Sequence, residues 1–293
     1  MTVVLRTRAE LRDWLQATTG PRAVVLTMGA LHAGHRALMQ AARAELGAGG
    51  TLVTTVFVNP AQFGPNEDFE QYPRTLEADV DLCRANGVDA VFAPEVDEVY
   101  PADEEVKDYE PGPLATELEG AARPGHFAGV LKVVSRLLQL TDADVTFFGE
   151  KDFQQLTLVR RLVQVEPRLA KCRVVGVPIQ RDADGLALSS RNRYLSDEQR
   201  QQALAIPETI ALVRRLCEDG LDAAQAARIG RGFLATSPGI TVDYVVVRSV
   251  GLGPQPLEGE GRVLIAARVG GTRLLDNGPV MVKPNAAQDP SNA

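Results

Sequence analysis

The chain has 293 residues, of which 45% are hydrophobic and 24% are charged, and its formal net charge is −7. This length suits one large or two modest domains with a substantial core, and the acidic balance argues against nucleic acid as a main partner. No run of about eighteen apolar residues occurs, so no membrane span is expected. Residues 1–10 lack an apolar run, and Cys83, Cys172 and Cys217 are scattered singly. We therefore expect no signal peptide and a location in the reducing cytoplasm.

Apolar strand-like runs alternate with helical patterns in the first part of the chain. The predicted strands span 23–27, 51–58, 88–92, 144–148 and 173–177. The predicted helices span 34–47, 75–86, 128–140 and 152–165. Apolar strands that alternate with helices indicate an α/β domain with a parallel sheet covered on both faces. Segment 95–125 interrupts the alternation and is rich in Pro, Glu and Asp, and long excursions of this kind are often functional.

The pattern changes after the turn at 182–185. Residues 197–235 are helical and alanine-rich, and Pro207 either starts a second helix there or kinks the first. Strands are then predicted at Val242–Val247, Arg262–Ala267 and Arg273–Leu275, with a hairpin signal at Gly270-Gly271. We expect an α/β domain over 1–178, a smaller α+β domain over 179–283 and a disordered tail over 284–293.

Two histidines flank a glycine just after the first predicted strand. His32, Gly34 and His35 form an H-x-G-H pattern before a predicted helix, where backbone N–H groups, a helix N-terminus and two imidazoles suit a phosphate. The glycine spacing does not match a dinucleotide fingerprint. The histidines are alternatively structural, or half of a metal site, although a metal needs more ligands and His126 is the remaining histidine. Their position at the end of a sheet strand favours the phosphate.

Polar clusters follow two further predicted strands. Asn59 and Gln62 offer neutral donors and acceptors that suit a substrate with hydroxyls and a carboxylate, or they form a simple Asn-Pro turn. Lys151 stands at a predicted helix start, where a cation is unfavourable unless an anion is present. Asp152 is a candidate helix cap, and Gln155 lies one turn further on.

A last cluster opens the second half of the chain. Ser189, Ser190 and Arg191 offer two hydroxyls and a guanidinium for phosphate oxygens. Ser-Ser-Arg runs are also common in loops, so this cluster gains its meaning from the others.

Together these clusters resemble the pantothenate synthetase (pantoate–β-alanine ligase) family. The matching segments are Thr27–His35, Val56–Gly64 with Tyr72–Thr75, Glu117–Gly129, Phe147–Gln155, Asp184–Tyr194 and Leu274–Asn277. H-x-G-H alone is shared by many nucleotidyltransferases and class I aminoacyl-tRNA synthetases, whereas the whole set in this order covers nearly the full chain.

The resemblance implies an ATP-dependent enzyme that converts pantoate to a pantoyl adenylate and then joins it to β-alanine, giving pantothenate, AMP and pyrophosphate. It also implies Mg²⁺ dependence, a homodimer, and a Rossmann-like ATP- and pantoate-binding domain followed by a hinged lid domain. The implied catalytic residues are His32, His35, Lys151 and Arg191, with His35 as proton donor. The implied ATP contacts are Met28, Gly29, Ala30, Leu31, His32, Ala33, Gly34, His35, Gly149, Glu150, Lys151, Asp152, Gln180, Leu188, Ser189, Ser190 and Arg191. Gln62 and Gln155 match pantoate-binding positions, and Gln62 also matches a β-alanine contact.

The chain departs from the family pattern at Leu26, Lys132, Phe153 and Gln180. Proline, a small polar residue, tyrosine and an apolar residue are usual there, so the role of Gln180 rests on its backbone. One rival is an H-x-G-H adenylyltransferase for a phosphorylated substrate such as a pantetheine phosphate, which needs more cations than these neutral amides provide. Another is a non-catalytic adenine-nucleotide sensor, which has no need of two histidines together with a lysine and an arginine.

Overall fold

A computed structural model describes residues 2–47, 49–64 and 69–284. The chain divides into two compact units, which we describe separately. The N-terminal unit comprises Met1–Glu150 and Gln154–Pro178, and the C-terminal unit comprises Lys151–Phe153 and Ile179–Ala293. Of the helices in the described ranges, none combines the length and apolar character needed to span a bilayer. The predicted disordered tail falls, apart from Pro284, outside the described residues.

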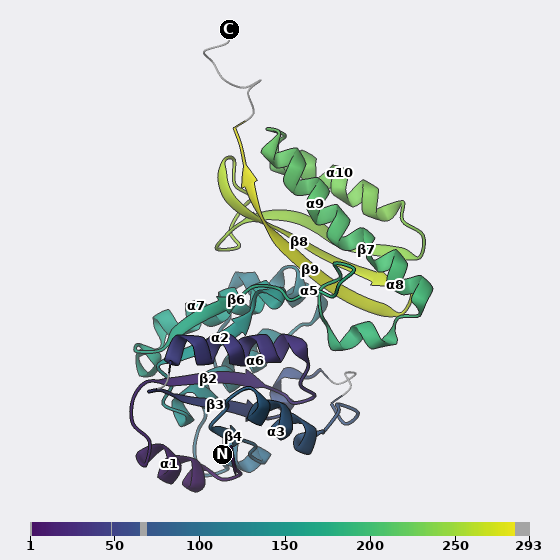
Figure 1. The fold of residues 1–293 in the computed structure, drawn as a ribbon. Helices are drawn as coiled ribbons and strands as arrows, with labels where there is room; N and C mark the ends of the chain where they lie inside the picture. Colours follow the sequence, from purple (N-terminus) through teal and green to yellow (C-terminus); the bar gives the residue numbers. More distant parts are fainter. Residues whose placement is uncertain (1, 48, 65–68, 285–293) are drawn as a thin grey trace. The chain divides into compact units, whose positions relative to one another are not determined.

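The N-terminal unit is built on a six-stranded sheet with the order β1-β4-β3-β2-β5-β6 (Figure 1). Every neighbouring pair is parallel, which confirms the predicted Rossmann-like α/β class. The strands are β1 (Val3–Leu5), β2 (Arg22–Thr27), β3 (Thr51–Val56), β4 (Ala90–Phe92), β5 (Val145–Gly149) and β6 (Arg173–Val177). Because β2, β3 and β5 run in parallel, the segments that follow them start from the same edge of the sheet.

Helices cover both faces of this sheet. They are α1 (Arg8–Gln16), α2 (Ala33–Leu46), α3 (Leu76–Ala85), α4 (Val96–Val99), α5 (Glu119–Ala122), α6 (His126–Leu140) and α7 (Phe153–Val165). Buried residues of α2 and α3, among them Met39 and Cys83, share one hydrophobic core with Val25 and Phe147 of the sheet. Right-handed crossovers place α1, α6 and α7 on the opposite face, where α1 packs against α6.

The excursion predicted over 95–125 is tied to the end of α7 by a buried carboxylate. Glu166 caps the short 3-10 helix η4 (Pro167–Leu169), and its side chain is 2% exposed. It accepts hydrogen bonds from Lys107 Nζ at 2.9 Å and from the Tyr109 hydroxyl at 2.7 Å. Burial raises the pKa of Glu166, but hydrogen bonds from Arg168, Lys107 and Tyr109 outweigh it and hold the pKa well below its usual range.

The Glu166 carboxylate should make the free energy of unfolding depend on pH in the acid range. Its folded-state pKa is depressed, so its contribution is complete above the unfolded-state value of about 4.3 and is lost as the pH falls further. We expect Glu166→Gln to lower the free energy of unfolding at pH 7 on the order of 2 kcal/mol, with a smaller difference from the original chain at pH 3. Urea denaturation at both pH values measures this. Glu110→Gln, at an exposed position nearby, is the control; an equal loss at both pH values would contradict the prediction.

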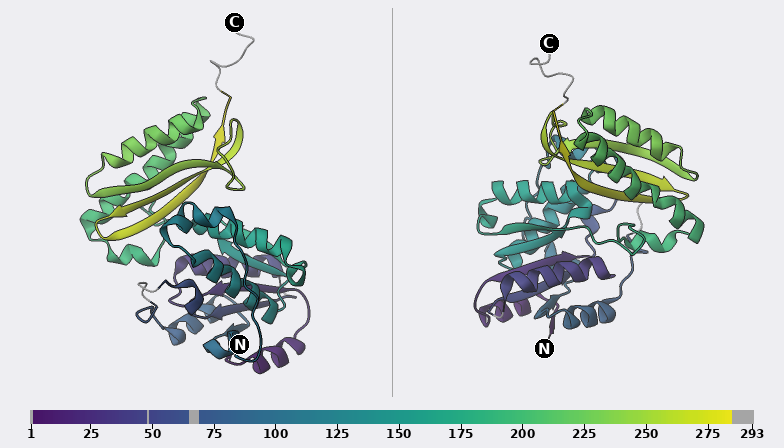
Figure 2. Two further views of the ribbon diagram at one scale, coloured as in Figure 1. Left: turned by 180° about the vertical axis from the view of Figure 1, so that it is seen from behind. Right: turned by 45° about the horizontal axis from the view of Figure 1, so that its top comes forward.

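The C-terminal unit packs helices on one face of a three-stranded antiparallel sheet, β7-β8-β9 (Figures 1 and 2). Its elements are α8 (Asp197–Ala203), α9 (Ala205–Glu218), α10 (Ala223–Ala235), β7 (Ile240–Ser249), β8 (Gly259–Val269) and β9 (Thr272–Val282). A core that includes Ile210, Val213 and Leu234 joins the helices to the sheet. Pro207 lies in the first turn of α9, so it starts the second helix, one of the two predicted alternatives.

Candidate functional site

The loop between β2 and α2 is held from inside by Asp79 of α3. Gly29 and Ala30 have φ angles of 85° and 50°, which turn the following N–H groups toward the Asp79 carboxylate. The N–H of Leu31 donates to Oδ1 at 2.7 Å, and that of Ala30 donates to Oδ2 at 3.1 Å. A side chain at position 29 would place its Cβ 3.0 Å from Oδ2, so this turn requires glycine.

These bonds change how the loop can meet a phosphate. The sequence pattern suggested that backbone N–H groups of the turn would surround the anion. Instead, the N–H of Gly29 donates to Thr27 Oγ1 at 3.2 Å, and those of Ala30 and Leu31 serve Asp79. These three N–H groups are therefore engaged within the protein, and the histidine side chains of the loop are its candidate donors to a ligand.

The side chains of His32 and His35 both accept hydrogen bonds from backbone N–H groups at the start of α2. The N–H of Gly34 donates to His32 Nδ1 at 3.1 Å, and the N–H of His32 donates to His35 Nδ1 at 3.2 Å. The ring centroids lie 4.2 Å apart. A ring nitrogen that accepts a hydrogen bond carries no proton, so this network assigns the neutral tautomer with the proton on Nε2 to both rings. Each imidazole is thereby prepared as a hydrogen-bond donor at Nε2.

Asp79 is a residue that the sequence analysis missed, and its substitution should disturb the loop. The side chain is 2% exposed, and Asp79→Asn would turn an amide N–H toward one of the two backbone donors. With ATP, the substrate that the family resemblance implies, we expect kcat/KM to fall about tenfold. Steady-state kinetics with Asp81→Asn, an exposed position on the same helix, provides the control. Unchanged kinetics in Asp79→Asn would show that the loop keeps its shape without this carboxylate.

Gln62 lies next to this loop. Its side-chain amide donates to Met28 Sδ at 2.9 Å and accepts from Asn59 Nδ2 at 3.1 Å. Asn59 is 1% exposed and also accepts from the Tyr100 hydroxyl at 2.8 Å. The Asn59–Gln62 turn contains the 3-10 helix η1 (Pro60–Gln62). It places the Gln62 amide, a candidate substrate-binding group, in contact with Met28 of the histidine loop.

His126 and Gly129 of α6 contact the backbone of the same turn. The Gln62 carbonyl accepts from His126 Nδ1 at 2.9 Å, and Arg123 Nη1 lies 3.1 Å from His126 Nε2. His126 therefore carries its proton on Nδ1, the opposite tautomer to the other two histidines. A Cβ at Gly129 would overlap the Ala61 carbonyl, so the helix approaches the turn more closely than any other residue type allows. His126 positions Gln62 through its backbone.

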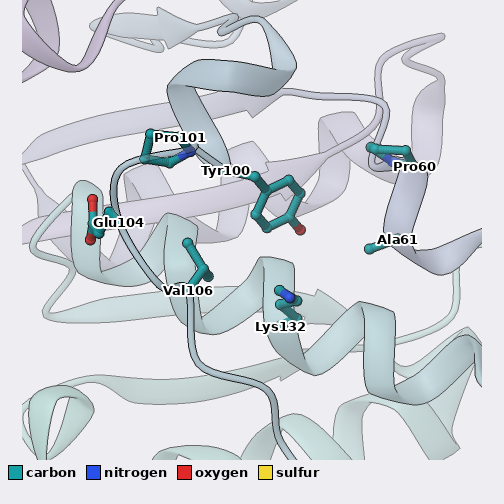
Figure 3. A pocket seen from close by; sticks show the side chains of 7 residues that line it. All are labelled: Pro60, Ala61, Tyr100, Pro101, Glu104, Val106 and Lys132. Atoms are coloured by element: carbon teal, nitrogen blue, oxygen red, sulfur yellow. The ribbon is translucent and has the colours of Figure 1, made fainter.

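A hollow of about 420 Å³ opens beside this turn (Figure 3). Its lining residues are Pro60, Ala61, Tyr100, Pro101, Glu104, Val106 and Lys132. The Lys132 ammonium lies 2.9 Å from Asp108 Oδ1 and 5.8 Å from the centre of the Tyr100 ring. The departure at Lys132 is thus accommodated by an ion pair and an aromatic contact.

The segment after β5 divides between the two units. Gln155 is half-buried on α7, and its neighbour Gln154 is buried, donating to the carbonyls of Leu114 and Glu117 at 2.7 and 2.9 Å. Lys151 belongs to the C-terminal unit, with its ammonium 3.7 Å from Asp152 Oδ1. Among the predicted site residues of this segment, Gln155 therefore belongs to the N-terminal unit and Lys151 to the C-terminal unit.

The remaining predicted contacts lie in the C-terminal unit. Leu188 donates its N–H to the Gln180 carbonyl at 2.8 Å, so these two positions are neighbours through their backbones. Ser189 caps the 3-10 helix η5 (Ser190–Tyr194) by accepting from the Arg191 N–H at 3.3 Å. The side chains of Ser190 and Arg191 are exposed, as groups that bind a soluble ligand would be.

Other chemistries find little support among the described residues. No group of three or more His, Cys, Asp or Glu side chains there is arranged to hold a metal ion. Burial raises the pKa of Cys83 to about 12 and that of Cys172 and Cys217 to about 11. Thiols with such pKa values stay protonated at neutral pH and are poor nucleophiles.

Comparisons with known proteins agree on one family. The family profile described as pantoate-beta-alanine ligase matches residues 3–279. The pantothenate synthetase of Saccharopolyspora erythraea is 49% identical over 274 residues, covering 94% of this chain and 88% of that protein. The enzyme of the same name from Salinispora arenicola is 47% identical, covering 97% and 99%.

Solved structures give the same picture. A pantothenate synthetase from Thermus thermophilus has a TM-score of 0.84 and 43% identity, with 94% of this chain and 98% of that one covered. A pantoate-beta-alanine ligase from Francisella tularensis, complexed with beta-gamma ATP and beta-alanine, has a TM-score of 0.74 and 31% identity, with 95% and 97% covered. The fold and both units of this chain thus have counterparts in these enzymes.

Proposed function

The chain belongs to the pantoate–β-alanine ligase family, and we propose that it works through a pantoyl adenylate. It is an ATP-dependent ligase that condenses (R)-pantoate with β-alanine to give pantothenate. In the first proposed step, a carboxylate oxygen of pantoate attacks the α-phosphorus, and the bond to the bridging oxygen breaks to release pyrophosphate. In the second, the amine of β-alanine attacks the acyl carbon, AMP leaves with its oxygen, and the amine proton passes to solvent.

The observation that carries this proposal is the shared tautomer of His32 and His35. Both rings accept a backbone hydrogen bond at Nδ1, which leaves Nε2–H as the donor of each ring. Negative charge grows on the α-phosphate and on the leaving pyrophosphate during adenylation. Two pre-oriented neutral donors stabilise that charge without first being reoriented. In this tautomer His35 acts as a hydrogen-bond donor, and the role does not require a charged ring.

The C-terminal unit supplies the cations of the proposed mechanism. Lys151, with a side chain that is 18% exposed, acts as a point charge on the phosphates, and Arg191 stabilises the charge that develops on them. Residues Met28 to His35, Gly149 to Asp152, Gln180 and Leu188 to Arg191 complete the proposed ATP contacts. This unit then serves as a lid domain that protects the adenylate from water. We propose that Mg²⁺ enters with ATP, as part of the substrate complex.

Gln62 and Gln155 are the proposed pantoate ligands, and Gln62 also contacts β-alanine. Their amides are neutral, so they bind hydroxyl and carboxylate oxygens without the positive charge that a second phosphate would need. This distinguishes the ligase from an adenylyltransferase of phosphorylated substrates. The proposal further includes a homodimer in the cytoplasm, and sedimentation equilibrium of the purified chain tests the dimer.

The adenylate route predicts pyrophosphate exchange. With pantoate, ATP and Mg²⁺ but without β-alanine, labelled pyrophosphate should appear in ATP, because the first step is reversible on its own. Omitting pantoate is the control and should abolish the exchange. An absolute requirement for β-alanine would overturn the adenylate. AMP formation that depends on both pantoate and β-alanine separates the ligase from a nucleotide sensor.

A further inference from the structure

Two buried side chains of the C-terminal unit contact the segment Lys151–Phe153. Asn277 of β9 donates from Nδ2 to the Lys151 carbonyl oxygen at 2.9 Å. Arg262 of β8 places its guanidinium carbon 3.8 Å from the centre of the Phe153 ring. These contacts explain why Lys151–Phe153 groups with residues that lie far along the chain.

These two side chains are themselves fixed. Arg262 donates from Nε to Asn277 Oδ1 at 2.7 Å, and the two residues are 7% and 3% exposed. The Asn277 amide therefore uses its oxygen for Arg262 and its nitrogen for Lys151, so its orientation is determined. A buried amide with both ends engaged is costly to displace.

Asp276 extends the support to the loop that carries the other proposed cation. Its carboxylate accepts hydrogen bonds from Arg181 Nη1 and Nη2 at 2.7 and 2.9 Å, and the Asn277 N–H donates to its Oδ1 at 2.7 Å. Arg181 forms an antiparallel β-bridge with Ala187 across a tight turn. Asn277, Asp276 and Arg181 thus link the Lys151 backbone to Ala187, two residues before Ser189.

We propose that Asn277 and Arg262 are positioning residues that fix Lys151 relative to Ser189–Arg191, so that Lys151 and Arg191 move as one body. The inference deepens the proposed function, since it rests on the role of Lys151 in binding phosphate. Neither residue touches the reacting atoms. Their contribution reaches the reaction through the Lys151 backbone, which sets where the ammonium can reach.

Asn277→Asp tests this with a small change. The carboxylate keeps an acceptor for Arg262 but loses the donor to the Lys151 carbonyl and repels that oxygen. We expect the rate of pyrophosphate exchange to fall about tenfold and the apparent KM for ATP to rise, with KM for pantoate little changed. In a Lys151→Ala background the same substitution should have almost no further effect, because both changes act through one group.

Arg273→Gln is the matched control. Arg273 also lies on β9, but at the start of the strand beside the β8–β9 hairpin, where it makes an ion pair with Asp243 at 2.6 Å. We expect its exchange rate to stay within about twofold of the original. Arg262→Met, which keeps an apolar cover over Phe153 but loses the bond to Asn277, gives a second test if Asn277→Asp folds poorly.

The outcomes separate the two levels of the proposal. Absence of exchange in the unaltered chain would refute the adenylate mechanism itself. Exchange in the unaltered chain together with an equal loss from Asn277→Asp in the presence and absence of Lys151 would refute the positioning role. A lowered melting temperature with unchanged exchange would also refute it, since Asn277 would then be structural alone.

Discussion

Adenylation by the His35→Ala variant should be slower by at least about a hundredfold, the usual effect of losing one donor to a transition-state oxyanion. His35 accepts the His32 N–H at Nδ1, which places the ring proton on Nε2, the donor that we propose for the phosphates. The substitution removes the donor and the cap together. Single-turnover formation of pantoyl adenylate, followed by rapid quench, measures the effect on the chemical step.

Two further variants distinguish the donor from the cap. His35→Asn keeps an acceptor near the position of Nδ1 but has nothing in place of Nε2, so it should be stable and as slow as His35→Ala. His35→Gln places an amide N–H near the position of Nε2, and it should recover part of the rate. If the asparagine variant were fast, the histidine would serve the helix cap and not the phosphates.

The second large effect is expected at Gln62, where alanine should raise the pantoate KM about a hundredfold. The amide is fixed between Met28 and Asn59, and a bound substrate oxygen that loses its partner there remains desolvated and unpaired. The ATP KM should change little, while β-alanine use should also weaken. Initial-rate kinetics with each substrate varied in turn gives the three constants.

Gln155→Ala and Lys151→Ala are the matched comparisons for this division of the site. The first should affect pantoate while sparing β-alanine, and the second should mainly impair ATP binding and adenylation. The assignment would be wrong if Gln62→Ala raised only the ATP KM. It would equally be wrong if Lys151→Ala raised only the pantoate KM.

Much of the fold was predictable because the central strands of the parallel sheet are rich in apolar and β-branched residues. The predicted strands at 23–27, 51–58 and 144–148 correspond closely to β2, β3 and β5. Strand β1 and helix α1 were missed, although Thr7 and Glu10 form a capping box at the start of that helix, a pattern visible in the sequence. Strand β9 was predicted too short, since Asp276 and Asn277 are polar, yet both are buried against partners that are distant in sequence.

For the candidate site, the sequence offers residue types and their positions after the strands, but not the hydrogen bonds between them. H-x-G-H and its position after β2 could be read directly, whereas the direction of the loop N–H groups depends on Asp79, which lies on another helix. The same limit applies to His126, which appeared as a spare histidine and holds the Gln62 backbone. Hydrogen bonds between distant segments leave no periodic signal in a sequence.

The attachment of Lys151–Phe153 to the C-terminal unit has a practical consequence for recombining this enzyme with its relatives. A crossover placed at residue 178 would leave Lys151 and Phe153 from one parent facing position 277 and position 262 from the other. Chimaeras should therefore inherit residues 151–153 together with the C-terminal unit from a single parent. The structural units of this chain are discontinuous in sequence. Gene recombination at a single linear boundary would therefore split the C-terminal unit.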